Sequence, residues 1–168
     1  MGFLRNRGDD GGIKFQLREK MISIGDDYWI EDDSGNLLFR VNGKAARMRD
    51  TWILEDKHGN DVAKIQEKKI SVRDKINIEV GDREATVKKA LVGFRDRFHV
   101  EVERGQDLKV HGNIVDHEYE IERDGDQIAE VSKKWFRARD TYGVEVDDIA
   151  DAPLVLAVTV AVDALSHD

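Results

Sequence analysis

The stretch "ARDTYGVEV" (residues 138–146) alternates apolar and polar residues after an Arg-Asp pair. Alternation with a period of two is typical of a β-strand that buries one face. The same arrangement occurs four times, with each pair 14 and 15 residues after a turn glycine. The glycines are Gly35, Gly59, Gly81 and Gly125, and the pairs are Arg49-Asp50, Arg73-Asp74, Arg95-Asp96 and Arg139-Asp140. Such internal repetition indicates one structural unit used four times.

The residues that follow each pair also correspond between the four copies. A large apolar residue comes two positions after the aspartate, a second apolar residue two positions later, and a glutamate directly after that. The three sets are Trp52, Ile76, Phe98 and Tyr142; Leu54, Ile78, Val100 and Val144; and Glu55, Glu79, Glu101 and Glu145. Because side chains alternate between the two faces of a strand, we expect both apolar sets to face the same side of the sheet.

The remaining segments extend the strand pattern along most of the chain. Turn sequences such as "DDSGN" (32–36), "DKHGN" (56–60) and "RDGDQ" (123–127) separate the copies. Further alternating segments occur in "IKFQLRE" (13–19) and "HEYEIE" (117–122). Together they predict about twelve short antiparallel strands between Ile13 and Asp147. An open twisted sheet of that size would expose its edges, so a closed β-barrel is favoured.

The pattern ends at "APLVLAVTVAV" (152–162), which is almost entirely apolar. Its valines would also suit a buried strand, and periodicity alone does not decide between strand and helix. However, a barrel of twelve strands has a lumen too wide for its own side chains to fill. A helix that is apolar on all sides is a buried helix. We therefore predict a central helix from Pro153 to Leu165, capped by Asp151.

Composition restricts the class of protein further. The 168 residues are 40% hydrophobic with a single proline, which argues against a disordered chain. No cysteine is present, which excludes disulfides and thiolate chemistry and favours the cytoplasm. The net charge of −8 disfavours nucleic acid as a partner. We expect residues 1–12 to form a flexible leader and residues 13–168 to form a single domain.

These features together resemble the LURP-one-related branch of the tubby C-terminal-like superfamily, which also includes phospholipid scramblases. The resemblance rests on four stretches: "FQLREKMISIGDDYWIED" (15–32), "LKVHGNIVDHEYEI" (108–121), "GDQIAEVSKKWFRARDTYGVEV" (125–146) and "LVLAVTVAVDAL" (154–165). It covers nearly the whole chain and implies a twelve-stranded barrel around a hydrophobic C-terminal helix. Tubby domains bind phosphoinositides and scramblases act at membranes, but a shared fold does not transfer an activity. The absence of cysteine argues against a scramblase role.

Positive charge gathers in alternate turns. The segments 42–49, 66–73, 88–95 and 132–139 contain thirteen Lys and Arg residues and one acidic residue, Glu67. In an up-and-down meander these turns would share one end of the barrel, which predicts an anion-binding rim. The candidate residues are Lys44, Arg47, Lys68, Lys69, Lys88, Lys89, Lys133, Lys134 and Arg137. The alternative interpretation is that these residues protect strand ends and pair locally.

Catalytic and metal-binding motifs are not evident. No serine stands in a nucleophile-elbow sequence, and no glycine-rich phosphate loop occurs. His111 and His117 with Asp116 and Glu118 lack the spacing of metal ligands, so we expect no metal site and no cofactor. The acidic turns lack the full ligand pattern of a calcium loop.

The sequence thus predicts a non-enzymatic binding module that is cytoplasmic and peripheral at a membrane. Its expected partners are an anionic membrane surface, a phosphorylated small molecule or an acidic protein. Two alternatives stay open: a hydrolase-like enzyme that uses carboxylates, and a structural or protein-interaction barrel without a ligand.

Overall fold

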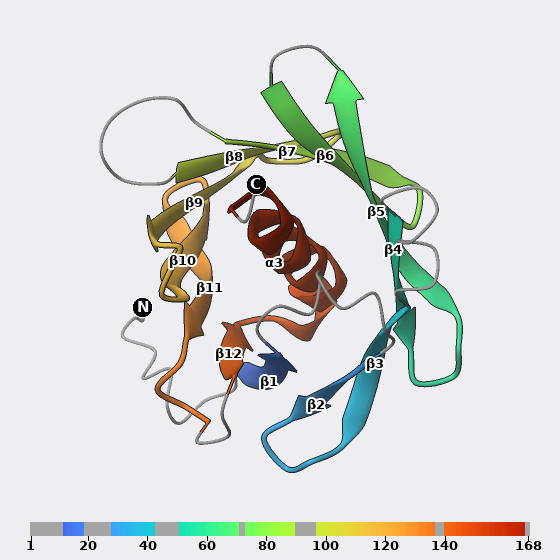
Figure 1. Ribbon diagram of the computed structural model, residues 1–168, viewed down its shortest axis with the longest axis vertical. Helices are drawn as coiled ribbons and strands as arrows, with labels where there is room; N and C mark the ends of the chain where they lie inside the picture. The colour runs from blue at the N-terminus through green and yellow to red at the C-terminus, as the bar shows by residue number, and fades with distance from the viewer. Residues whose placement is uncertain are drawn as a thin grey trace.

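Twelve antiparallel strands form a closed barrel around one helix (Figure 1). The computed structural model describes residues 12–18, 28–42, 51–70, 73–89, 97–136 and 140–166. The strands are β1 (Ile13–Arg18), β2 (Tyr28–Asp32), β3 (Leu37–Asn42), β4 (Thr51–Asp56), β5 (Asp61–Ile70), β6 (Arg73–Val80), β7 (Arg83–Lys89), β8 (Arg97–Val102), β9 (Leu108–Asn113), β10 (Glu118–Arg123), β11 (Asp126–Ser132) and β12 (Thr141–Val146). The leader expected at residues 1–12 lies outside the described residues, apart from Gly12.

Each strand pairs with its neighbours in the sequence, and β1 pairs with β12 to close the ring. The closing register runs from Ile13 opposite Val146 to Arg18 opposite Thr141. Closure leaves no free edge with unpaired backbone groups, which is the physical reason to prefer a barrel over an open sheet. The predicted twelve-stranded closed barrel is confirmed.

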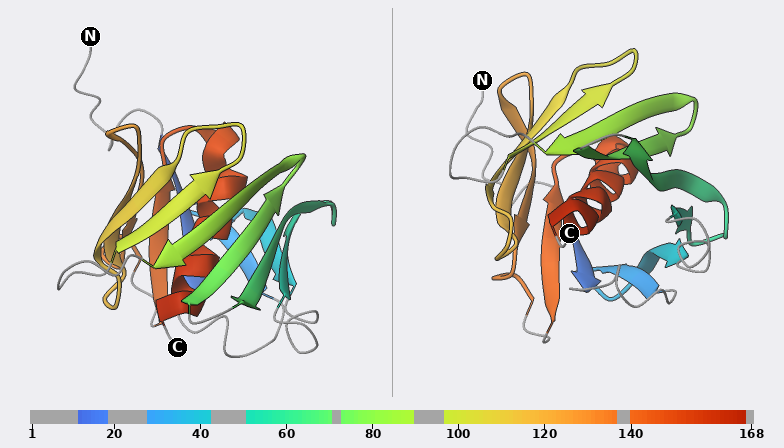
Figure 2. Two further views of the ribbon diagram at one scale, coloured as in Figure 1. Left: turned by 90° about the horizontal axis from the view of Figure 1, so that it is seen from above. Right: turned by 45° about the horizontal axis from the view of Figure 1, so that its top comes forward.

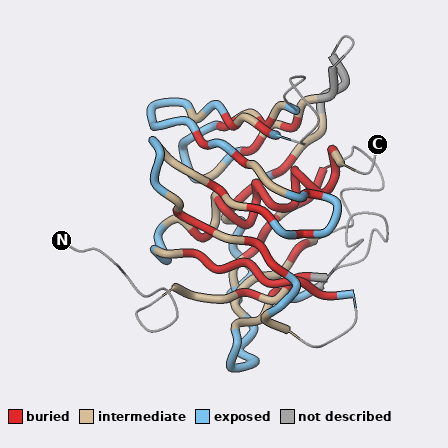
Figure 3. The backbone as a smooth tube through the Cα atoms, turned by 90° about the vertical axis from the view of Figure 1, so that its left-hand side faces the viewer, coloured by how far each residue is buried: buried red, intermediate tan, exposed pale blue. Residues whose placement is uncertain are grey.

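The apolar C-terminal segment forms helix α3 (Ala152–Ser166), which follows a short 3₁₀ turn, η1 (Ile149–Asp151). The views in Figure 2 show the helix running through the ring of strands, and Figure 3 shows it buried along its length. Its residues from Val155 to Leu165 are all buried, whichever side of the helix they occupy. A lone strand in the lumen would leave its backbone polar groups without partners, whereas a helix satisfies them internally. This explains why a helix forms despite its four valines.

The helix prediction of Pro153–Leu165 is confirmed within one residue at each end. The predicted cap is wrong, because Asp148 rather than Asp151 caps the start of this region. The Asp148 side chain accepts a hydrogen bond from the backbone N–H of Ala150 at 3.0 Å. Asp151 instead pairs with Arg123 of β10 at 2.7 Å, which ties the start of the helix to the wall of the barrel.

The four repeats occupy equivalent places in the barrel. Both predicted apolar sets are buried and point into the lumen, with exposed fractions of 5% or less. Three of the glutamates lie on the outer wall and pair with a basic residue of a neighbouring strand. The pairs are Arg40–Glu55, Lys88–Glu101 at 2.8 Å and Lys14–Glu145 at 3.6 Å.

The Arg-Asp pairs are less uniform than the apolar residues that follow them. Positions 50, 96 and 140 directly precede β4, β8 and β12, whereas Arg73-Asp74 begins β6 itself. Strand β6 begins earlier in its repeat than the other three strands do, because only residues 71 and 72 separate it from β5. The residues Arg49, Asp50, Arg95, Asp96 and Arg139 lie outside the described residues.

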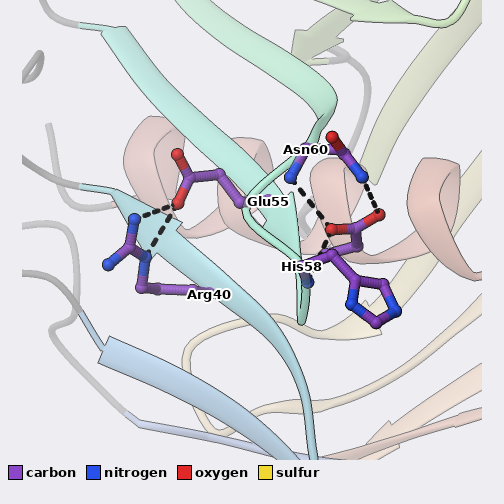
Figure 4. A network of polar contacts seen from close by, with 5 residues as sticks. Arg40, Glu55, His58 and Asn60 are labelled. Carbon is purple, nitrogen blue, oxygen red and sulfur yellow. Dashed lines mark hydrogen bonds and ion pairs between the residues drawn. The ribbon is translucent and has the colours of Figure 1, made fainter.

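Two turns share one arrangement of hydrogen bonds. Asp32 accepts from the backbone N–H groups of Ser34 and Asn36 at 2.9 and 2.8 Å, and from the Asn36 side chain. Asp56 does the same with His58 and Asn60, beside the Arg40–Glu55 pair (Figure 4). These bonds lower the pKa of both carboxyl groups. The ionised form therefore holds the turns at neutral pH, and acidification through the lowered pKa removes that contribution.

Burial of the helix yields the first testable prediction. The substitution Val158→Asp would place an unpaired charge in the lumen, where Val158 is fully buried. We expect a loss of several kcal/mol, enough to abolish cooperative thermal unfolding measured by circular dichroism. Ile149→Asp is the matched control, because Ile149 is 53% exposed just before the helix and should change stability by about 0.5 kcal/mol or less. A cooperative melt of Val158→Asp near the wild-type temperature would contradict this account.

Candidate functional site: the basic end of the barrel

The strand order assigns the connections to two ends of the barrel. In an antiparallel ring of sequential neighbours, alternate connections lie at opposite ends. The connections that follow β1, β3, β5, β7, β9 and β11 therefore share one end, which we call the basic end. All four lysine- and arginine-rich segments belong to this set. The connections that follow β2, β4, β6, β8, β10 and β12 share the opposite, acidic end.

The predicted site residues are described to different extents. Lys88 is half-buried and pairs with Glu101 at 2.8 Å, which lowers the pKa of Glu101. Lys89, Lys133 and Lys134 are exposed at the basic end. The backbones of Lys68 and Lys69 lie in β5, opposite Lys75 and Asp74 of β6. Lys44, Arg47 and Arg137 lie outside the described residues.

The register reveals a basic residue that sequence reasoning missed. Lys75 of β6 stands directly opposite Lys68 of β5 on one side and Lys88 of β7 on the other. Lys75 and Lys88 are half-buried and adjoin the buried residues Ile76 and Val87, and Lys68 is the register partner of Lys75. The three backbone positions therefore form one row across β5, β6 and β7 near the basic end, which we call the lysine row. Like charges directly opposite one another destabilise a sheet. Lys75 was missed because its place in this row depends on a register that composition does not reveal.

The segment that carries Lys133 and Lys134 is held against the barrel. Glu118 accepts hydrogen bonds from the Ser132 hydroxyl and the Lys133 backbone N–H, both at 3.0 Å. The rings of Trp135 and Phe136 lie over Gly143 of β12, where an added Cβ would come within 2.8 Å of either ring. Gly143 therefore permits these aromatic residues to pack on the wall. The two lysines are consequently presented from an anchored segment.

A polar cluster lies buried beneath the basic end. The Tyr142 hydroxyl donates to Asp163 of α3 at 2.5 Å, and His117 Nε2 lies 3.3 Å from the other oxygen of Asp163. The His117 ring stacks on Tyr142 with a centroid distance of 4.2 Å. Burial raises the pKa of Tyr119 well above its usual value, and the charge of Asp163 adds to this effect. The cluster therefore joins the end of the helix to β12 and to the connection between β9 and β10.

Sequence reasoning also missed this cluster. Asp163 follows the apolar run and carries no motif, so its role emerges only when the helix is placed in the lumen. His117 was grouped with His111 as a loop histidine, but it is 5% exposed and points inward. His111 lies in β9 on the outer wall. The two histidines therefore do not belong to one site.

Comparison with known proteins agrees with the architecture. A profile of the LURP-one-related family matches residues 13–163. The chain belongs to the LURP-one-related family. A solved structure of a protein from Arabidopsis thaliana is similar, with a TM-score of 0.57 and 15% sequence identity. The match covers 98% of this chain and 99% of the Arabidopsis chain, and at this identity it supports the tubby-like fold alone. The search of curated proteins found no match.

The buried cluster of this LURP-one-related barrel gives a second prediction. Tyr142→Phe keeps the aromatic packing but removes the hydroxyl that donates to Asp163. A hydrogen bond to a charged group contributes about 1.5–3 kcal/mol, so we expect a lower midpoint in urea unfolding with an unchanged slope. Tyr119→Phe is the comparison, because within the described residues the Tyr119 hydroxyl is buried without a hydrogen-bond partner, so its removal should cost less. Equal stability of Tyr142→Phe and wild type would show that Asp163 does not tie the helix to β12.

Proposed function

We propose that this LURP-one-related protein is a non-enzymatic binding module that recognises phosphate groups at its basic end. The observation that carries the proposal is the lysine row, Lys68, Lys75 and Lys88, in a protein of net charge −8. Like charges opposite one another in adjacent strands cost free energy, which the Glu101 carboxylate offsets in part at Lys88. A bound phosphate would supply that compensation.

Other features of the basic end support the proposal. Lys133 and Lys134 are exposed on an anchored segment, so the backbone that carries them is ordered before a ligand binds. Val115, in the connection between β9 and β10, is 71% exposed at the same end. An exposed apolar residue at the same end as the lysines suits the interface of an anionic membrane, where each lysine contributes about 1 kcal/mol. We propose on this basis that the protein works in the cytoplasm, peripheral to a membrane.

The enzymatic alternative is less well supported. A carboxylate hydrolase needs two carboxyl groups that converge on one cleft. Among the described residues, the buried carboxylates are Glu55, Glu145 and Asp163. Each contacts a different partner, respectively Arg40, Lys14 and Tyr142. These contacts fit structural roles.

The test is co-sedimentation with vesicles that contain or lack phosphatidylserine, at low and at moderate salt. We expect binding to the anionic vesicles that weakens as salt rises, because exposed charges are screened. Reversing Lys68, Lys75, Lys133 and Lys134 to Glu should abolish binding while circular dichroism stays unchanged. The matched control reverses four basic residues near the acidic end, Lys57, Lys64, Arg83 and Arg104, and changes the net charge by the same amount.

Titration with inositol hexakisphosphate separates the two sources of phosphate. Binding of this soluble anion without vesicle binding would assign the site to phosphorylated small molecules. Binding lost equally in both reversal variants would reflect net charge alone and would contradict a site at the basic end. Absence of binding to both probes at low salt would contradict the proposed function.

A further inference from the structure

The outer wall of β9 and β10 carries a cluster with the donor atoms of a metal site. His111 Nε2 lies 2.9 Å from Oε1 of Glu122 and 3.9 Å from Oε2 of Glu120. The three donor atoms lie within 4.8 Å of one another. A zinc ion bound at its usual ligand distances holds such donors about 3.4 Å apart, so small rotations of these half-buried side chains would suffice.

Strand pairing fixes the positions of the three residues. His111 stands directly opposite Glu120, and Glu122 follows two residues later on the same outer face. All three side chains therefore project from a rigid two-stranded ladder rather than from loops. The spacing escapes a sequence search because one ligand belongs to a different strand from the other two.

The surrounding charge favours a bound cation. Glu120 stands opposite Glu130 of β11, which stands opposite Glu145 of β12, so three glutamates share one row. Lys14 pairs with Glu145 at the far end of this row, at 3.6 Å. Both Glu120 and Glu122 lie within ion-pair distance of His111, and Lys109 stands opposite Glu122. A divalent ion would relieve the repulsion between these like charges.

The cluster also has open space beside it. One hollow of about 270 Å³ is lined by His111, Glu118, Glu120 and Glu130, among others. A second, of about 500 Å³, is lined by Glu122, His99, Asp107 and Lys109, among others. An ion held by three protein ligands would thus keep positions open for water or for a small anionic ligand, as sites with three protein ligands do.

We propose that His111, Glu120 and Glu122 bind a divalent transition-metal ion on the outer wall of the barrel. The imidazole nitrogen distinguishes this set from calcium and magnesium sites, which use oxygen ligands. One imidazole with two carboxylates suits zinc, manganese, iron or cobalt. The site uses none of the lysines of the basic end, so loss of metal binding and loss of phosphate binding are distinguishable by separate substitutions.

The experiment is calorimetric titration of the untagged, chelator-treated protein with zinc chloride, alongside visible absorption with Co²⁺. We expect one equivalent of zinc per chain with micromolar affinity. His111→Asn and Glu122→Gln should each weaken binding at least tenfold. A saturating level of zinc should raise the melting temperature of wild type and leave that of His111→Asn unchanged.

The control is His99→Asn, because His99 lies on the same wall, 3.3 Å from a single carboxylate, Asp107. This variant should bind zinc like wild type. No saturable zinc binding up to millimolar concentration would overturn the proposal. Unchanged binding in His111→Asn, or an equal loss in His99→Asn, would overturn it as well. A circular dichroism spectrum of each variant serves as the check that it is folded.

Discussion

The fold depends on filling the lumen with a segment that satisfies its own backbone hydrogen bonds. Twelve strands enclose more space than their inward side chains occupy. Water in that space would leave the apolar side chains of the wall exposed to solvent. Helix α3 solves this problem because its amides bond along the helix while Val155 to Leu165 pack on all sides. Each buried valine or leucine contributes about 1.5–3 kcal/mol, so barrel and helix are stable only together.

Both ends of the helix are tied to the wall by polar contacts. Asp151 pairs with Arg123 at the acidic end, and Asp163 accepts from Tyr142 at the basic end. These contacts fix how far the helix enters the lumen. Apolar packing alone would leave the helix free to slide along the barrel. The C-terminus of the helix, with its partial negative charge, lies at the end where the lysines gather. The partial negative charge of the helix end and the positive charge of the lysines are therefore complementary.

The barrel was predictable from the sequence because its signals are local and repeated. The period of two located the strands, the turn residues located the hairpins, and closure followed from the number of strands. The central helix was predictable because Ala152–Val162 is apolar on every face. Asp148 was missed as the cap because the short 3₁₀ turn before α3 carries no periodic signal.

The candidate sites were only partly predictable. Composition located the basic turns, but the lysine row and the His111 cluster depend on which residues face one another across strands. That register is a property of the closed ring rather than of any one segment. The outer wall is consequently divided, with lysines in one row across β5, β6 and β7 and glutamates in another across β10, β11 and β12. The inward apolar positions are buried in all four repeats, so the outer positions can differ without disturbing the fold.

Native-state hydrogen exchange tests most directly whether the helix and the barrel form one cooperative unit. The account predicts that the amides from Val158 to Leu165 exchange only through global unfolding, with the same free energy as the central amides of β5 to β7. It also predicts that this free energy equals the value from urea unfolding. Exchange of the helix amides through a local opening, well before those of the strands, would show that the barrel is stable without its helix and would contradict the account.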